Sequence, residues 1–156
     1  DVCQDTFLAL LAHIEECQRQ LDGYQLAVEF RNRTWFEGKH TAATLDFERH
    51  RGLVNVVVDA PVALPNTIPS VWEVTNPDLA IVRLHGRNHG AWNRKGLKTS
   101  WQRFDYDYAN DELGGLAEDI TALAPKAKTV HVLFNNNYQD QGQRGARTLA
   151  SMLPAN

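Results

Sequence analysis

Four short apolar runs, each ending in charged or amide residues, most strongly constrain how this chain can fold. The runs cover 25–31, 54–59, 80–85 and 129–135, and β-branched and other aliphatic residues dominate them. Such runs are typical of buried parallel strands. A loop and a helical pattern follow three of the four, which predicts β-loop-α units. Ligands in such folds bind beyond the carboxyl ends of the strands, so the polar run-ends indicate where a site should lie.

Apolar residues at helical spacing predict helices over 6–21, 42–51, 109–124 and 143–153. The connection 60–77 contains four prolines and is predicted to be irregular. The chain opens on a helix, and only four strands follow. Because four parallel strands cannot close a barrel of the usual eight, we expect an α/β fold that is either half of a TIM-like barrel or a small open sheet.

Composition supports one globular domain over residues 1–156. Hydrophobic residues make up 43% of the chain and charged residues 22%. The net charge of -3 gives no general reason to expect a nucleic-acid partner, although a local basic patch can still exist. No run approaches the roughly 20 apolar residues of a membrane span, and no leader peptide is recognisable. We therefore expect a cytoplasmic protein with no membrane contact, and with Cys3 and Cys17 reduced.

The polar run-ends supply candidate catalytic and binding residues. Side chains alternate across a strand, so Glu29 and Arg31 share one face, as do Arg83 and His85. We expect these groups and Asp59 to converge on one face of the sheet. Glu29, Asp59 and His85 are then candidate acid–base catalysts, and the two arginines are candidate anion ligands. The alternative is a buried ion network of Glu29, Arg31, Arg83 and Asp59 that only fixes the interior.

Other residues offer weaker signals. Asn135 and Asn136 point to opposite faces of a regular strand, so only one of them can line a site, and both can instead be turn residues. Arg87 lies in a glycine-containing segment and can bind a phosphate or a carboxylate. The six histidines lack the spacing of a metal motif. We predict no metal and no cofactor.

The connection 86–108 interleaves aromatic residues with Lys and Arg. This combination can form a stacking and electrostatic surface for single-stranded nucleic acid. The favoured alternative is a lid whose aromatic side chains pack over the strand ends while its cations face solvent, because loops at that end of α/β folds commonly cover sites.

Several motifs together resemble a known family. They are Ala27-Val28-Glu29-Phe30-Arg31 with Trp35, Val57-Val58-Asp59, Val82-Arg83-Leu84-His85-Gly86-Arg87-Asn88, and Phe134-Asn135-Asn136-Asn137. In order and approximate spacing they are similar to the successive motifs of the DUF72 (YecE-like) family. The resemblance implies a TIM-barrel-like fold of unestablished activity, of which this chain matches the later part. It also implies that the family pattern places Glu29, Arg31, Asp59, Arg83 and Asn135 at the strand ends.

We therefore expect a barrel half that binds a small polar or anionic ligand at its strand ends, with acid–base chemistry of the hydrolase or isomerase type as the catalytic option. The predicted ligand-binding residues are Arg31, Trp35, Arg83, Arg87, Asn88, Asn135 and Asn136. One alternative is a non-catalytic nucleic-acid-binding module that uses the connection 86–108. Another is a structural fragment that needs its other half, or a second copy, to cover exposed parallel sheet edges.

Overall fold

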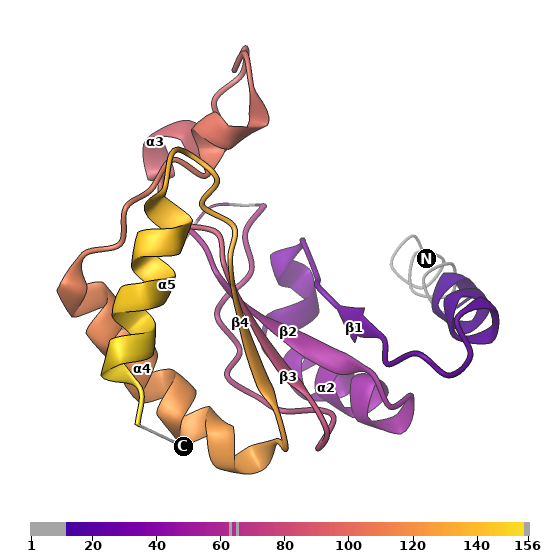
Figure 1. Cartoon of the computed structure of the whole chain (residues 1–156). Coiled ribbons are helices and arrows are strands. Elements are labelled where there is room, and N and C mark those ends of the chain that lie inside the picture. Colours follow the sequence, from indigo (N-terminus) through magenta and orange to yellow (C-terminus); the bar gives the residue numbers. More distant parts are fainter. Residues whose placement is uncertain (1–11, 63, 65, 155–156) are drawn as a thin grey trace.

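An open sheet of four parallel strands forms the centre of the computed structural model, which describes residues 12–62, 64 and 66–154. The strands lie in chain order, and each is hydrogen-bonded to the next (Figure 1). Their bounds are Ala27–Val28 for β1, Val54–Asp59 for β2, Ala80–Leu84 for β3 and Val130–Phe134 for β4. This arrangement confirms the predicted α/β class with four parallel strands.

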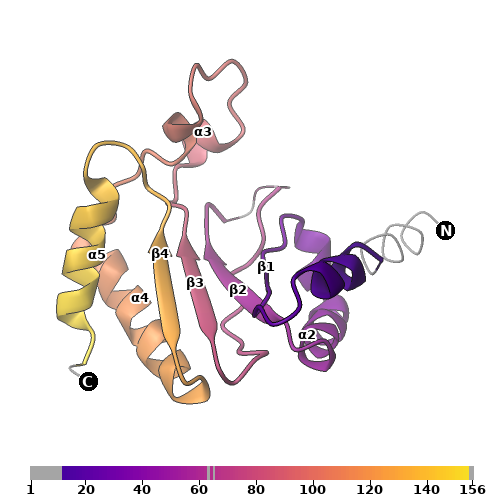
Figure 2. The ribbon, with the colours of Figure 1, turned by 45° about the vertical axis from the view of Figure 1, so that its right-hand side comes forward.

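Helices follow the strands as the β-loop-α pattern predicts. The long ones are α2 (His40–His50), α4 (Asn110–Leu123) and α5 (Gln141–Met152), and residues 12–20 are also helical. Short turns of helix complete the set: η1 (Arg33–Phe36), α3 (His89–Trp92), η2 (Ser100–Arg103) and η3 (Ala124–Lys126). Figures 1 and 2 show α4 and α5 side by side along one face of β3 and β4.

Most predicted boundaries hold to within two residues, but β1 is much shorter than the predicted strand. Only Ala27 and Val28 pair with β2, and residues 29–31 leave the ladder. The side chain of Asn32 then caps η1 by accepting a hydrogen bond from the backbone N–H of Thr34. The early part of the predicted helix 6–21 and Cys3 lie outside the described residues, and Cys17 is an exposed free thiol.

Burial of apolar residues between β3 and α4 explains why these elements pack. Val82 and Leu84 have no exposed surface, and they join Leu113, Leu116 and Ile120 of α4 in one cluster. Burying each of these side chains stabilises the fold by roughly 1.5–3 kcal/mol. A second cluster gathers around β2 and the segment after β1, and it comprises Phe30, Phe36, Leu45, Val56, Val58, Ala60, Ile68 and Trp92.

The proline-rich connection between β2 and β3 contains no helix or strand in its described part, as predicted. It runs beside β2 and is held there by side-chain hydrogen bonds. Asn55 donates to the carbonyls of Val71 and Glu73, and the Thr75 hydroxyl donates to the carbonyl of Leu53. The polar Asn55 in the middle of an apolar run therefore has a structural partner.

One face of the sheet remains uncovered by helices. This inner face carries Ala27, Val56, Ile81, His131 and Leu133, as the strand register requires. Leu133 on this face is 49% exposed. The outer edges of β1 and β4 have no strand partner among the described residues.

We expect this chain to self-associate in isolation, because uncovered apolar surface and open parallel edges favour pairing with another chain. Light scattering coupled to size-exclusion chromatography should give about twice the mass of a single chain, since four strands are half of the roughly eight that close a β/α barrel. Leu133→Lys should restore the single-chain mass by placing a charge on the inner face. A single-chain mass for the unaltered protein at high concentration would contradict this expectation.

None of the helices in the described part of the chain is long and apolar enough to cross a membrane.

Candidate functional site

Strand register divides the polar run-ends between the two faces of the sheet. Asp59 is paired with Leu84, so both lie on the face that α4 covers, whereas Arg83 and His85 lie on the inner face. Glu29 contacts Arg83 and His85 directly. The expectation that Asp59 converges with these residues on one face is therefore wrong. Convergence would have required Asp59 to pair with Arg83, but Val58 pairs with Arg83, and this offset of one residue puts Asp59 on the other face.

Glu29 is the centre of the inner-face cluster, which comprises Glu29, Arg31, Arg83, His85 and Asn135. Its Oε1 accepts hydrogen bonds from Arg31 Nη1 at 2.6 Å and from His85 Nε2 at 3.1 Å. Its Oε2 accepts from Arg83 Nη1 at 2.7 Å. One carboxylate thus holds two guanidinium groups and one imidazole where β1 and β3 end.

Asn135, which directly follows β4, fixes the orientation of this cluster. A guanidinium can only donate, so the Asn135 Oδ1 atom faces Arg83 Nη2, at 3.3 Å. The Asn135 Nδ2 group therefore donates to His85 Nδ1, at 3.0 Å. On its other side, His85 Nε2 faces the Glu29 carboxylate and donates to it. No local pattern predicts these contacts, because they join residues from three segments that are distant in the sequence.

The protonation state of Glu29 follows from these contacts. Burial alone would raise the pKa of its carboxyl, but the hydrogen bonds from His85, Arg83 and Arg31 outweigh burial and lower the pKa to about 2. Glu29 is consequently ionised at neutral pH, with both oxygens engaged. Its contribution to stability is present above the ordinary pKa of 4.5 and is lost as the pH falls toward 2.

A hollow of about 330 Å³ opens beside this cluster on the inner face. Glu29, Arg83 and Asn135 line its polar end, and Ala27, Val56, Ile81 and Leu133 line the rest together with Phe134. The side chains of Arg31 and Arg83 are 57% and 38% exposed, so both can reach a ligand. With two guanidinium groups and one carboxylate, the cluster carries an excess positive charge that suits an anion.

Phe104 and Trp92 enclose the imidazole of His85 from the connection 86–108. The ring of His85 lies 5.6 Å from that of Phe104 and 6.0 Å from that of Trp92, and His85 is 1% exposed. The base of this connection therefore covers the strand end, as the lid interpretation predicts. Neither ring was among the predicted site residues, and no local spacing in the sequence points to them.

Asp59 is the centre of a second cluster on the helix-covered face. It accepts hydrogen bonds from Arg87 Nε and Nη2, and from the Tyr108 hydroxyl at 2.6 Å. Arg87 Nη1 also donates to Glu112, as does the Tyr106 hydroxyl. Burial and the adjacent Asp59 carboxylate raise the pKa of Tyr108, so its hydroxyl keeps its proton. This cluster ties the connection 86–108 to β2 and α4.

The remaining predicted ligand-binding residues make structural contacts outside the inner-face cluster. Trp35 packs on Phe30 with ring centres 4.9 Å apart. The Asn88 Oδ1 atom accepts from the backbone of Ala91 and caps α3. Asn136 is 4% exposed, and its Nδ2 group donates to the carbonyl of Tyr106. As alternation predicts, only one of the two asparagines after β4 reaches the inner-face cluster.

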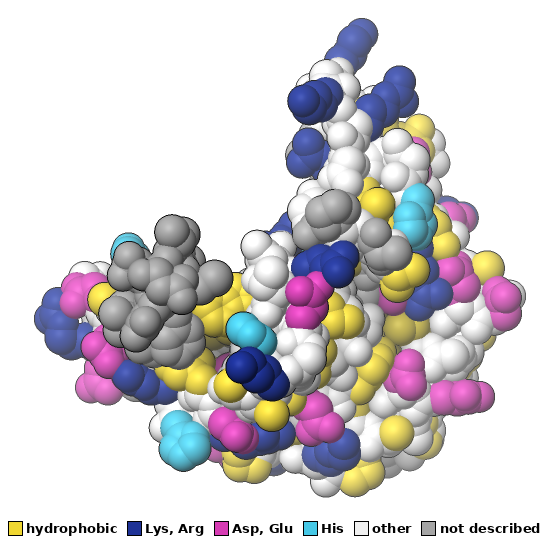
Figure 3. All heavy atoms as spheres, turned by 180° about the vertical axis from the view of Figure 1, so that it is seen from behind, with side chains coloured by type: hydrophobic (Ala, Val, Ile, Leu, Met, Phe, Trp, Pro, Cys, Tyr) yellow, Lys and Arg dark blue, Asp and Glu magenta, His cyan; other side chains and the backbone are white. Residues whose placement is uncertain are grey.

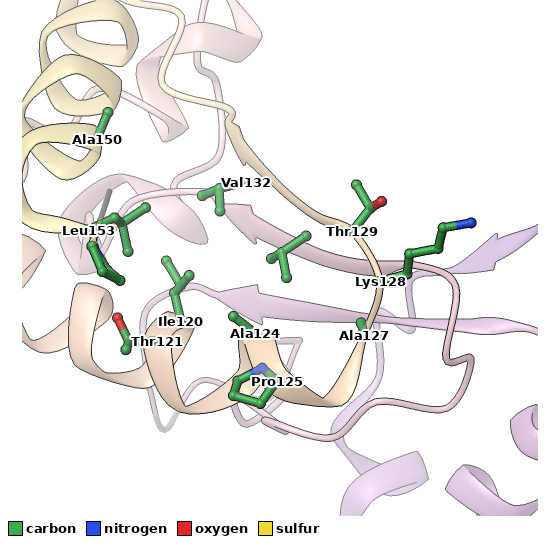
Figure 4. A pocket seen from close by; sticks show the side chains of 12 residues that line it. Ile120, Thr121, Ala124, Pro125, Ala127, Lys128, Thr129, Val132, Ala150 and Leu153 are labelled. Carbon is green, nitrogen blue, oxygen red and sulfur yellow. The ribbon is translucent and has the colours of Figure 1, made fainter. Parts of the chain in front are cut away.

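Histidine and carboxylate side chains do not form a metal-binding group of three anywhere in the described part of the chain. A larger hollow of about 790 Å³ lies at the opposite ends of the strands, between η3, the start of β4 and the end of α5 (Figure 4). Apolar side chains such as Ile120, Val132 and Leu153 dominate its lining. It therefore offers little chemistry compared with the inner-face cluster.

Comparisons with known proteins place the chain in one family. The model of the family "Protein of unknown function DUF72" matches residues 4–156. The UPF0759 protein YunF of Bacillus subtilis (strain 168) is 33% identical over 145 residues, which cover 92% of this chain and 51% of that protein.

Solved structures agree with this assignment. A DUF72 family protein from Enterococcus faecalis V583 superposes with a TM-score of 0.85 at 28% identity, over 93% of this chain and 53% of the other. One from Thermotoga maritima MSB8 superposes with a TM-score of 0.74 at 36% identity, over 88% and 49% respectively. The chain thus spans about half the length of these relatives, and it belongs to the DUF72 family.

Proposed function

We propose that this chain binds a small anionic ligand, carrying a phosphate or carboxylate group, in the hollow beside the inner-face cluster. The observation that supports the proposal most directly is that one carboxylate, Glu29, holds both Arg31 and Arg83 while leaving them partly exposed. An arginine fork matches the oxygens of phosphate and carboxylate groups, and charge-assisted hydrogen bonds of this kind are about twice as strong as neutral ones.

In this proposal Glu29, His85 and Asn135 act as positioning residues. Glu29 fixes the two guanidinium groups, and Asn135 bridges Arg83 to His85. A carboxyl whose pKa lies at about 2 is a poor proton donor at neutral pH, so Glu29 is better suited to remain an anion than to act as a general acid. Acid–base catalysis at this site would start from His85, which holds a proton on Nε2.

Arg83→Gln tests the proposal through its effect on anion binding. Inorganic phosphate and malonate serve as probes, and their dissociation constants are measured by titration calorimetry at low salt. Loss of a charge-assisted contact worth about 1.5–3 kcal/mol should weaken binding by roughly ten- to hundredfold. Arg31→Gln should act in the same direction and leave the fold intact, because this side chain is more exposed.

Arg144→Gln is the matched control. Arg144 is also a partly exposed arginine paired with carboxylates, Asp107 and Asp140, but it lies on α5 outside the hollow. Its replacement should leave probe binding within about twofold, because surface pairs of this kind contribute little. If the unaltered protein binds neither probe, or if Arg83→Gln binds both as tightly as Arg144→Gln does, the proposal is wrong.

A further inference from the structure

The connection between β3 and α4 begins with a strongly one-sided charge pattern. Residues 86–104, named here the basic arm, contain Arg87, Arg94, Lys95, Lys98 and Arg103 but no aspartate or glutamate. The chain as a whole has a net charge of -3. Positive charge is thus concentrated in one segment of an otherwise acidic protein, and such local patches attract polyanions.

Four of these five cations are available to a partner. Arg94, Lys95, Lys98 and Arg103 are exposed, and the described structure shows no ion pair or side-chain hydrogen bond for any of them. Figures 1 and 2 show that the arm projects from the body of the protein, at the carboxyl ends of the strands. In Figure 3 the dark blue side chains gather on this projecting part. Arg87 differs, because Asp59 and Glu112 hold it.

An open hollow with an aromatic wall lies between the arm and Tyr138. It measures about 420 Å³, which falls in the range of roughly 300–1,000 Å³ typical of small-ligand sites. Trp101 and Tyr138 line it and stack on one another with ring centres 4.6 Å apart. Arg94 and Gln102 also line it. Asp105 is its one acidic residue, and its Oδ1 atom accepts a hydrogen bond from Gln141.

We infer that the basic arm binds single-stranded nucleic acid. The four free cations would contact successive phosphates, and the hollow beside Trp101 would receive a base. Flat aromatic surfaces next to backbone-tracking cations are the combination by which proteins hold single strands without reading their sequence. An acidic membrane surface fits less well, because membrane-surface segments also need an exposed apolar face. Trp92 is buried, and the other large apolar side chains of the arm are only partly exposed: Leu97, Trp101 and Phe104. This inference is independent of the proposed anion site on the inner face.

The first test compares two triple variants that remove the same charge, one inside the arm and one outside it. The arm variant carries Arg94→Gln, Lys95→Gln and Lys98→Gln. The control variant carries Lys126→Gln, Lys128→Gln and Arg147→Gln, which are exposed cations outside the arm. Fluorescence anisotropy of a labelled oligo-dT strand gives the affinity from about 50 mM to about 200 mM salt. The arm variant should bind at least roughly tenfold more weakly, with a salt slope shallower by about 2. The control variant should bind like the unaltered protein.

The second test examines stacking. Trp101→Ala should weaken binding by roughly five- to hundredfold, whereas Trp101→Phe should retain most of the affinity because a phenyl ring can still stack. Circular dichroism spectra confirm that each variant is folded. The inference is overturned if the unaltered protein does not bind oligo-dT at about 50 mM salt, or if both triple variants lose affinity equally. Binding to phosphatidylserine vesicles without binding to oligo-dT would likewise overturn it and assign the arm to a membrane surface.

Discussion

Replacing Glu48 with methionine is expected to stabilise the protein at neutral pH and to remove much of the pH dependence of its stability. Glu48 lies in α2 with no exposed surface, and neither of its carboxylate oxygens has a hydrogen-bond partner among the described residues. Burial raises the pKa of this carboxyl from 4.5 to about 8, with Arg49 opposing the shift. Methionine has a similar unbranched shape and no charge to desolvate.

The sign of the pH effect follows from the two pKa values. In the folded protein Glu48 keeps its proton up to about pH 8, whereas in the unfolded chain it loses the proton near pH 4.5. The folded state therefore binds more protons between these values, so the free energy of unfolding falls as the pH rises through this window. At about 1.4 kcal/mol for each pKa unit, the decrease amounts to as much as roughly 5 kcal/mol.

Urea denaturation at pH 4.5, 6 and 8 measures this effect. The lowest pH equals the ordinary pKa of Glu48 and the highest equals its pKa in the folded protein, and the middle value lies about halfway between them. Glu48→Met should flatten the profile and raise the free energy of unfolding at pH 8 by roughly 2–5 kcal/mol. Glu118→Met is the matched control, because Glu118 is an exposed glutamate on α4, and its profile should follow that of the unaltered protein. A profile for Glu48→Met that is as steep as that of the unaltered protein would show that Glu48 is not a buried neutral acid.

Gly86→Ala is expected to destabilise the protein by about 3 kcal/mol. Gly86 has a φ of +84°, and a Cβ atom at this position would lie 2.6 Å from Tyr106 Cβ and 2.8 Å from Asn136 Nδ2. Its N–H also donates to the Tyr108 hydroxyl, so displacement of the backbone would disturb the cluster around Asp59. Thermal unfolding should show a midpoint lower by roughly 6–12 °C.

Gly96→Ala separates backbone strain from crowding. Gly96 also has a positive φ, of +74°, but an added Cβ atom would meet nothing within 4 Å. Backbone strain alone should therefore lower the free energy of unfolding of the Gly96→Ala variant, by about 1–2 kcal/mol. Equal losses for the two variants would mean that the close contacts of Gly86 with Tyr106 and Asn136 contribute nothing to the destabilisation.

Local patterns were sufficient to predict the elements of this fold. The run Val54–Asp59 is a strand with the predicted bounds, and α4 lies within one residue of its predicted ends at each terminus. β-Branched runs and helical spacing act through neighbours a few residues apart, so they are visible in a sequence. The same is true of the alternation that separates Asn135 from Asn136. The short helices η1, α3 and η2 escaped prediction because each spans only four residues.

The candidate site was predictable only in part. Glu29, Arg83, His85 and Asn135 meet as expected, because parallel strands deliver their carboxyl ends to one edge of the sheet. The hydrogen bond of Asp59 with Tyr108, 49 residues along the chain, could not be anticipated.

The sequence by itself determined where the four strands lie along the chain, although β1 is shorter than its apolar run, and which side chains of one strand share a face. Only the tertiary structure decided how each strand is offset against its neighbour, and a shift of one residue transfers every side chain to the other face. That offset places Asp59 opposite Leu84 and leaves Glu29 as the carboxylate of the inner face. It results from the packing of helices and connections that are distant in sequence, so no single run encodes it.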